Sequence, residues 1–184
     1  PDKQFTVVEL PYFAKAQSFG SAQPGMYLGV ENRFFNLDNR GAEKNPLLNG
    51  VSHEFAHQFW GFAIDPNHIG GYSMLTEVLS KYIELVMMNK LYGETANLEA
   101  IHQAIDRYLR LRPYSQNTER PLFSVGMEPH IYYNKGQHSM HALMGLIGEE
   151  KINIALRNLL KDFAYPRKPT SLDLLNLFYQ QADA

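Results

Sequence analysis

Two histidines with a glutamate between them form the part of the sequence best suited to chemistry. They lie in the run His53-Glu54-Phe55-Ala56-His57. A spacing of four residues puts both imidazoles on one face of a helix, about one turn apart. Two neutral ring nitrogens in that arrangement can bind one zinc ion, with Glu54 beside them. The alternative is that both histidines are structural and flank a surface glutamate.

A third zinc ligand should lie farther along the chain, because a catalytic zinc site keeps three protein ligands and one position for water. The favoured residue is Glu77, which is one or two turns into a predicted helix after a glycine-rich loop. His68 is the alternative ligand, but it lies in that loop and lacks a helical frame. Glu84, one heptad after Glu77, is interpreted as an ordinary exposed helix glutamate. His138 and His141 have no nearby acid spaced to complete a second metal site.

The elements that must position these residues change in character along the chain. Residues 4–10 and 26–37 are rich in β-branched and apolar residues and predict two strands, with a loop at residues 17–25 between them. After Pro46, apolar residues recur at steps of three to four residues. This pattern predicts a helix that holds the two histidines and stops near Trp60-Gly61.

The remainder of the chain predicts further helices. Ser73 can cap a helix that Gly93 closes, and another helix at residues 98–111 ends before a proline. Residues 113–129 contain three prolines and predict a long irregular segment. More helices are expected at about 136–147, 150–163 and 171–181, the last with Thr170 and Asp173 in capping-box positions.

The composition excludes several classes of function. The chain has 184 residues, of which 45% are hydrophobic and 20% charged, with a net charge of −2. No strongly basic surface is therefore expected to hold nucleic acid or an anionic membrane. Cysteine is absent, so any metal must be bound by His, Asp or Glu. The sequence has neither an apolar run of about 18 residues nor a signal peptide, which predicts a soluble domain of a cytoplasmic or membrane-tethered parent.

Three segments resemble a known family. HEFAHQFWG at residues 53–61 and MLTEVLSKY at residues 74–82 resemble the HExxHxxWG and WLNEGFAxY segments of gluzincin aminopeptidases, the aminopeptidase N family (peptidase family M1). YYNKG at residues 132–136 resembles the YxKG segment of the same family. The resemblance covers nearly the whole chain, in the order found in the family.

This resemblance implies a function for five residues. His53, His57 and Glu77 are implied to bind one zinc ion. Glu54 is implied to act as general base toward the attacking water, and Tyr133 to supply the hydroxyl that stabilises the tetrahedral oxyanion. The family enzymes also carry a large N-terminal β domain and a C-terminal helical domain that close over the cleft.

The chain departs from the family in two places. It has nineteen residues between His57 and Glu77, where the family usually has eighteen, and we expect the loop at residues 64–72 to accommodate the extra residue. The glutamate of the family's GxMEN motif binds the free α-amine of the substrate. The nearest match here is LGVEN at residues 28–32, with Val in place of Met. The resemblance thus implies Glu31 as the amine-binding residue, and the alternative is an ordinary acid at a strand edge.

These expectations combine into an α+β fold, a thermolysin-like zincin catalytic domain over residues 1–184. A small sheet at about 4–37 leads into a mostly helical lobe at about 45–184. We expect a piece of a longer protein that acts on peptides, contacts other domains of its parent, and has no nucleic-acid or membrane contact of its own. The favoured function is a zinc metallopeptidase, specifically an aminopeptidase. The alternatives are a catalytically inactive relative that binds a peptide or partner protein, and a zinc endopeptidase.

Overall fold

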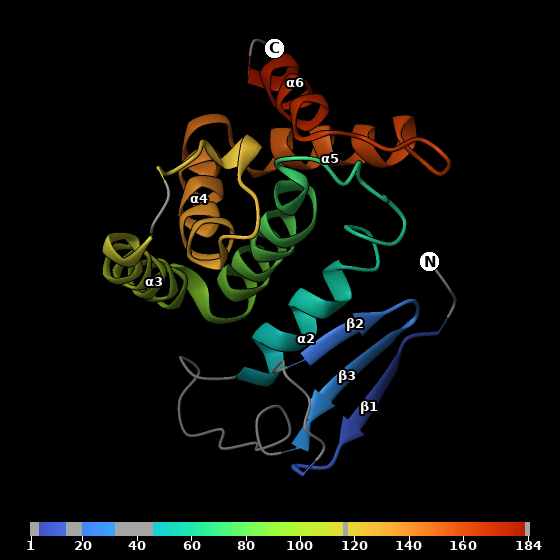
Figure 1. Cartoon of the computed structure of the whole chain (residues 1–184), viewed down its shortest axis with the longest axis vertical. Helices are drawn as coiled ribbons and strands as arrows, with labels where there is room; N and C mark the ends of the chain where they lie inside the picture. The colour runs from blue at the N-terminus through green and yellow to red at the C-terminus, as the bar shows by residue number, and fades with distance from the viewer. Residues whose placement is uncertain (1–3, 14–19, 32–45, 116–117, 183–184) are drawn as a thin grey trace.

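A three-stranded sheet lies at one end of the molecule, and the helices gather beside it (Figure 1). The computed structural model describes residues 4–13, 20–31, 46–115 and 118–182. The strands are β1 (Thr6–Leu10), β2 (Gly20–Gln23) and β3 (Met26–Val30), in the spatial order β1-β3-β2. The central strand β3 is parallel to β1 and antiparallel to β2. Sheet and helices are thus segregated, which makes this the expected α+β architecture.

Strand β2 corrects the prediction of a loop at residues 17–25. It pairs with β3 along its whole length. Its sequence, GSAQ, has no β-branched or aromatic residue, so pairing with β3 rather than local propensity makes it a strand. The strands predicted at residues 4–10 and 26–37 are present as β1 and β3. Residues 17–19 and 32–37 of these predictions lie outside the described residues.

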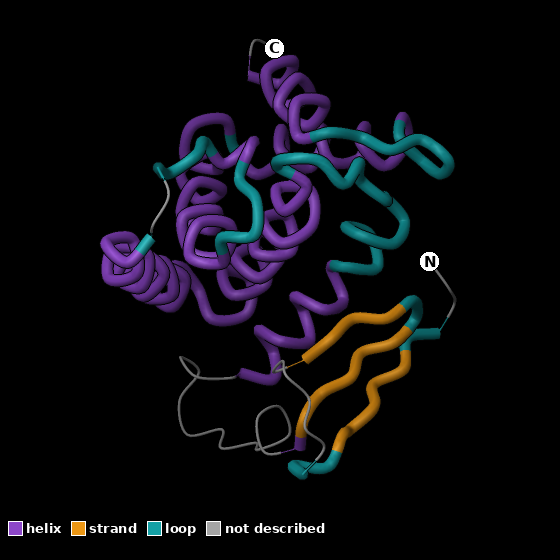
Figure 2. Tube along the Cα trace, in the orientation of Figure 1, coloured by secondary structure: helices purple, strands orange, loops and turns teal. Residues whose placement is uncertain are grey.

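Helix α2 (Pro46–Ala56) begins at its proline, as the sequence predicts, but ends four residues before Trp60-Gly61. The chain then turns sharply, with Gly61 at φ 128° and a short parallel bridge between Trp60 and Ile64. Figure 2 shows α2 between the sheet and the other helices, and α2 packs against both β2 and the helix that follows. This helix therefore joins the two parts of the fold.

The next helix begins as a π-helix, η2 (Met74–Val78), and continues as α3 (Leu79–Leu111). The sequence predicts two helices separated at Gly93. That residue does leave helical geometry, with φ 83° and ψ 177°, a conformation that glycine adopts without steric strain. Helical residues resume directly after Gly93, so two helices meet at a kink there, as predicted, and residues 94–97 are helical and do not form a loop.

The last three helices lie close to their predicted positions: α4 (Gly136–Ile147), α5 (Glu149–Asp162) and α6 (Ser171–Ala182). The predicted capping box is present at the start of α6. The Thr170 N–H donates to the Asp173 carboxylate at 2.7 Å, and the Asp173 N–H donates to Thr170 Oγ1 at 3.4 Å. The two residues therefore satisfy backbone donors at the helix start that have no partner within the helix.

The segment predicted as irregular contains only short helical turns within its described part, η3 (Arg112–Tyr114) and η4 (Leu122–Ser124). A second π-helix, η5 (His130–Lys135), then leads directly into α4. Glu119 ties the irregular segment down, because its carboxylate accepts a hydrogen bond from Tyr108 at 2.7 Å and pairs with Arg112 at 3.0 Å. The segment is thus anchored to the end of α3.

The hydrophobic core lies among the helices and surrounds the start of α3. The π-helix η2 and the first turns of α3 supply many of its side chains, and η5, α4, α5 and α6 add further apolar side chains to it. No helix in the described part of the chain is both long and apolar enough to cross a membrane. Fully buried core residues include Leu75, Val78, Leu79, Tyr82, Leu85, Ile131, Ile152, Leu159 and Leu174.

Gly136 brings the two π-helical segments into close contact. A Cβ at this position would lie 2.7 Å from Val78 Cγ2, and Val78 is fully buried. We therefore expect Gly136→Ala to lower the free energy of unfolding by about 1–3 kcal/mol, the usual cost of overpacking. Chemical denaturation followed by circular dichroism measures this change.

The matched control is Gly145→Ala on the same helix, where an added Cβ meets nothing within 4 Å. This change should raise the stability by up to about 1 kcal/mol, because alanine is the better helix former. If both variants had the stability of the parent, the close approach at Gly136 would not be a constraint on the fold.

Candidate metal centre

His53 lies in the last turn of α2, and His57 lies in the turn that follows the helix. The His57 N–H donates to the His53 carbonyl at 3.3 Å, so the helical spacing extends past the end of the helix. The two ring centroids are 4.8 Å apart with an interplanar angle of 84°. The two Nε2 atoms lie 3.2 Å from each other. Both imidazoles therefore direct Nε2 toward the same point.

Glu77 completes a group of three metal-binding side chains. Its Oε2 lies 3.2 Å from Nε2 of His53 and 3.6 Å from Nε2 of His57. Ligand atoms about 2.0–2.1 Å from a tetrahedral zinc ion would lie about 3.3–3.4 Å from one another, so these separations fit a single ion. Within the described ranges, this is the one group of three His, Cys, Asp or Glu residues whose atoms are close enough to share a metal.

The π-helical geometry of η2 occurs at the ligand itself. A π-helix closes its hydrogen bonds from i to i+5 and so contains one residue more per turn than an α-helix. The extra residue between His57 and Glu77 can therefore be accommodated within η2 as well as in the loop at residues 64–72. Thr76, on which a count of eighteen falls, directs its hydroxyl to the Tyr72 carbonyl at 3.5 Å.

Glu84 is buried, whereas the sequence analysis interpreted it as an exposed glutamate. It is 6% exposed, not a surface glutamate. Its Oε1 accepts a hydrogen bond from His53 Nδ1 at 2.7 Å, and its Oε2 pairs with Lys81 Nζ at 2.8 Å. A carboxylate on Nδ1 fixes the ring orientation and leaves Nε2 free for a metal. Glu84 is therefore a residue of the site that sequence analysis missed.

His57 is oriented in a similar way. Its Nδ1 lies 3.0 Å from the Trp60 carbonyl and 3.3 Å from the hydroxyl of Ser80, which is fully buried. Ser80 and Glu84 follow Glu77 by three and seven residues, which places all three on one face of a helix. This periodicity was the signal in the sequence that could have identified the two supporting residues.

The buried charges of the site compensate one another. Burial acts to lower the pKa of His53, but its hydrogen bonds to Glu77 and Glu84 outweigh burial and raise that pKa to about 9. Burial acts to raise the pKa of Glu77, but its contacts with both imidazoles hold that pKa well below the usual range. The site thus maintains an ionised carboxylate facing two imidazoles, which is the protonation state that a divalent cation requires of an acidic ligand.

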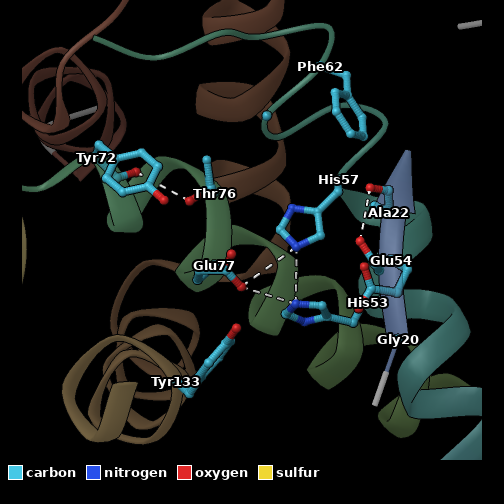
Figure 3. A pocket seen from close by; sticks show the side chains of 12 residues that line it. Gly20, Ala22, His53, Glu54, His57, Phe62, Tyr72, Thr76, Glu77 and Tyr133 are labelled. Atoms are coloured by element: carbon cyan, nitrogen blue, oxygen red, sulfur yellow. Dashed lines mark hydrogen bonds and ion pairs between the residues drawn. The ribbon is translucent and has the colours of Figure 1, made fainter. Parts of the chain in front are cut away.

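Glu54 and Tyr133 join the three donors around one pocket of about 370 Å³ (Figure 3). Burial raises the pKa of Glu54 above its ordinary value, although the neighbouring imidazoles and the Ala22 backbone act in the opposite direction. Burial, followed by the charge of Glu77, also raises the pKa of Tyr133, so its phenol stays protonated. The pocket is lined by Gly20, Ser21, Ala22, His53, Glu54, His57, Gly61, Phe62, Tyr72, Thr76, Glu77 and Tyr133.

The residues predicted from the sequence fall into two groups. The structure brings His53, Glu54, His57, Glu77 and Tyr133 together around the pocket. The other two predicted candidates do not line it. Glu31 follows β3 and is exposed, and His68 is 70% exposed and pairs with Asp65 at 3.5 Å.

Strand β2 forms one wall of the pocket through Gly20, Ser21 and Ala22. Sequence analysis missed this contribution because it assigned these residues to a loop. Glycine and alanine side chains have no polar atoms. This wall can therefore offer hydrogen bonds only through its backbone and the Ser21 hydroxyl.

Comparison with known proteins identifies the family of the chain. A sequence model of the family described as "Peptidase family M1 domain" matches residues 5–184. The chain belongs to peptidase family M1. Human endoplasmic reticulum aminopeptidase 2 is 31% identical over 121 residues, which are 62% of this chain and 12% of that protein.

Solved structures of M1 zinc metallopeptidases share the fold. A mutant of the Deinococcus radiodurans enzyme bound to a Tyr-Ser-Ala substrate matches with a TM-score of 0.70 and 22% identity, over 100% of this chain and 37% of that one. A mutant of a two-domain M1 zinc metallopeptidase bound to L-tryptophan matches with a TM-score of 0.68 and 22% identity, over 98% of this chain and 37% of that one. The predicted zincin fold is thus confirmed, in a chain that spans little more than a third of these M1 structures.

The buried contact between Glu84 and His53 predicts the effect of removing its charge. We expect Glu84→Gln to weaken zinc binding by about 10- to 100-fold, since groups that orient a ligating histidine typically contribute this much to metal affinity. Competition with a chelator of known zinc affinity measures the change.

Glu99→Gln serves as the control, because Glu99 is an exposed acid on the same helix α3. Its zinc affinity should equal that of the parent. Equal affinity in the Glu84 variant, with an unchanged circular dichroism spectrum, would show that this carboxylate does not support the metal site.

Proposed function

We propose that this M1 family chain is a zinc-dependent peptidase domain that hydrolyses peptide bonds, and that it acts as an aminopeptidase. The observation that carries the proposal is the convergence of three donors, spaced for one zinc ion, with Glu54 and Tyr133 on the same pocket. A peptide substrate is supported by the Deinococcus radiodurans relative bound to Tyr-Ser-Ala. Aminopeptidase activity is supported by the human relative, which is an aminopeptidase.

The zinc ion in this proposal would be held by His53, His57 and Glu77. When bound, zinc supplies a Lewis acid for the scissile carbonyl and makes water nucleophilic near neutral pH. Glu84 accepts the His53 Nδ1 proton, and the Trp60 carbonyl does the same for His57. With Nδ1 engaged in this way, each imidazole would bind zinc through Nε2, which must give up its proton when the ion binds because a ligating histidine is neutral.

Glu54 is the proposed general base. It lies next to the first ligand in the sequence and lines the pocket beside all three donors. Its pKa, raised by burial, makes the carboxylate a better proton acceptor than a solvent-exposed glutamate. Glu54 would take a proton from the attacking water and pass it to the leaving amine.

Tyr133 is the proposed oxyanion donor. Its ring lies 5.9 Å from the His53 ring, and its side chain lines the same pocket as Glu77. A protonated phenol in this place can donate to the carbonyl oxygen as the carbon becomes tetrahedral. Because that bond strengthens chiefly in the transition state, its loss should lower kcat rather than weaken substrate binding.

Three variants separate these roles. Glu77→Ala should lose the single equivalent of zinc that the parent binds, because two imidazoles remain as ligands. Glu54→Gln and Tyr133→Phe should keep zinc and lower kcat, by about 10²–10⁴ for the base and about 10²–10³ for the oxyanion donor. Elemental analysis and hydrolysis of a fluorogenic peptide measure the two properties.

The results also distinguish the competing functions. A parent that contains zinc but cleaves no peptide would be a binding domain, and a parent without zinc would refute the enzyme proposal. Zinc retained in Glu77→Ala would place the third ligand elsewhere.

Aminopeptidase specificity requires a group that binds the free α-amine of the substrate. We expect the parent to cleave Tyr-Ser-Ala and to leave its N-acetylated form intact. If Glu31 binds the amine, Glu31→Gln should raise the KM of the free peptide by about 10- to 150-fold, which corresponds to the loss of one hydrogen bond to a charged group. Cleavage of both forms by the parent would indicate an endopeptidase, and an unchanged KM in the variant would assign the amine to another residue.

A further inference from the structure

Gln58 connects the zinc-binding segment to the sheet. It directly follows His57 in the sequence, yet its side chain is 8% exposed and is not among the residues that line the pocket. Its Nε2 donates to the Gln23 carbonyl at 2.9 Å, and its Oε1 accepts from the Gly25 N–H at 2.7 Å. A single amide therefore uses both of its polar ends on the β2–β3 turn.

The turn held by Gln58 is itself a junction of the sheet. Gly25 has φ 71°, and its carbonyl accepts a hydrogen bond from the Thr6 N–H of β1 at 2.9 Å. The Gly25 N–H donates to Gln58, and the Gly25 carbonyl accepts from β1, so both backbone polar groups of this residue have a hydrogen-bond partner. A movement of the Gln58 amide would consequently shift the end of β2 relative to the sheet.

Strand β2 needs an anchor on the pocket side. It pairs with β3 on one edge, and within the described part of the chain no strand pairs with its other edge. An unpaired strand edge offers backbone donors and acceptors to an extended peptide. On this side, β2 is tied to the zinc-binding segment by the hydrogen bond between the Ala22 backbone and Glu54 (Figure 3) and by the amide of Gln58.

We propose that Gln58 is a positioning residue that sets the separation between β2 and the three zinc ligands, and thereby the fit of a peptide main chain between them. The proposal rests on the peptidase function proposed above. The role requires an amide, because the side chain must donate to the Gln23 carbonyl and accept from the Gly25 N–H at the same time. Only a side chain of glutamine's length with one donor and one acceptor can do both. Gln58 contacts neither the pocket nor the zinc ligands through its side chain, so zinc binding should not depend on it.

The test uses two variants of the zinc-loaded protein. Gln58→Met keeps the length of the side chain and removes both hydrogen bonds, and Gln58→Glu keeps the acceptor for Gly25 but removes the donor to Gln23. Gln103→Met, an exposed glutamine on α3, is the matched control. The measurements are zinc content, amide hydrogen exchange at Gly25, and the kinetics on the tripeptide Tyr-Ser-Ala and on a one-residue tyrosine arylamide.

We expect both variants to retain one equivalent of zinc. Exchange at Gly25 should accelerate about tenfold or more in Gln58→Met and much less in Gln58→Glu, because only the first loses the acceptor. In both variants the KM of the tripeptide should rise by about 3- to 10-fold, with a smaller change in kcat. The arylamide, which has no further peptide unit to lie along β2, should be affected less.

Three results would overturn the proposal. Loss of zinc in the variants would show that Gln58 supports the metal site instead. An equal increase of KM for both substrates would indicate a general loosening of the pocket. An unchanged KM for the tripeptide, with accelerated exchange at Gly25, would show that the turn can move without affecting the substrate.

If the parent protein binds zinc but cleaves nothing, the peptidase function fails separately from this inference. The dissociation constant of the tripeptide, measured by calorimetry, then replaces KM. A 3- to 10-fold weaker binding to Gln58→Met would support the positioning role, and equal binding would refute it.

Discussion

The buried hydrogen bond between Glu84 and His53 is the interaction on which the rest of the site depends. An ionised carboxylate in a protein interior is strongly destabilising unless it is paired, and Glu84 has partners at 2.7 Å and 2.8 Å in His53 and Lys81. Since His53 belongs to α2 and Glu84 to α3, the contact fixes one helix against the other. Glu77 precedes Glu84 by seven residues on the same continuous helix. The contact that orients His53 Nδ1 thus also brings the third donor to the Nε2 side.

The pocket is assembled from both halves of the fold, with α2 between them. On one side β2 is held to the segment after α2 through Gln58, and on the other side η5 carries Tyr133 toward Glu77. Gly136 permits that approach because it has no Cβ to meet Val78. The chemical groups therefore come from segments up to eighty residues apart, between His53 and Tyr133, and backbone packing determines their distances.

Local signals in the sequence were sufficient for much of the fold. The capping residues before α6, the proline at the start of α2 and the apolar periodicity of the later helices all act within a few residues, so their effect can be read directly. Strand β2 could not be recognised, because GSAQ becomes a strand only by pairing with β3. The HExxH spacing identified two donors, and the place of Glu77 in a predicted helix favoured it as the third, which the family resemblance also implied. The spacing of Glu77 and Glu84 indicates a shared helix face, but the burial of Glu84 follows from packing between α2 and α3, which this spacing does not show.

The π-helix at Glu77 has a consequence for how such chains are found. In an α-helix, one inserted residue rotates everything after it by about 100°, which would turn a ligand away from its partners. A π-turn absorbs the insertion locally and leaves the side chains on either side in register. The interval between His57 and Glu77 can therefore differ by one residue while the three donors still converge on one point. A search that demands a fixed interval would discard this chain, although its ligand geometry is intact.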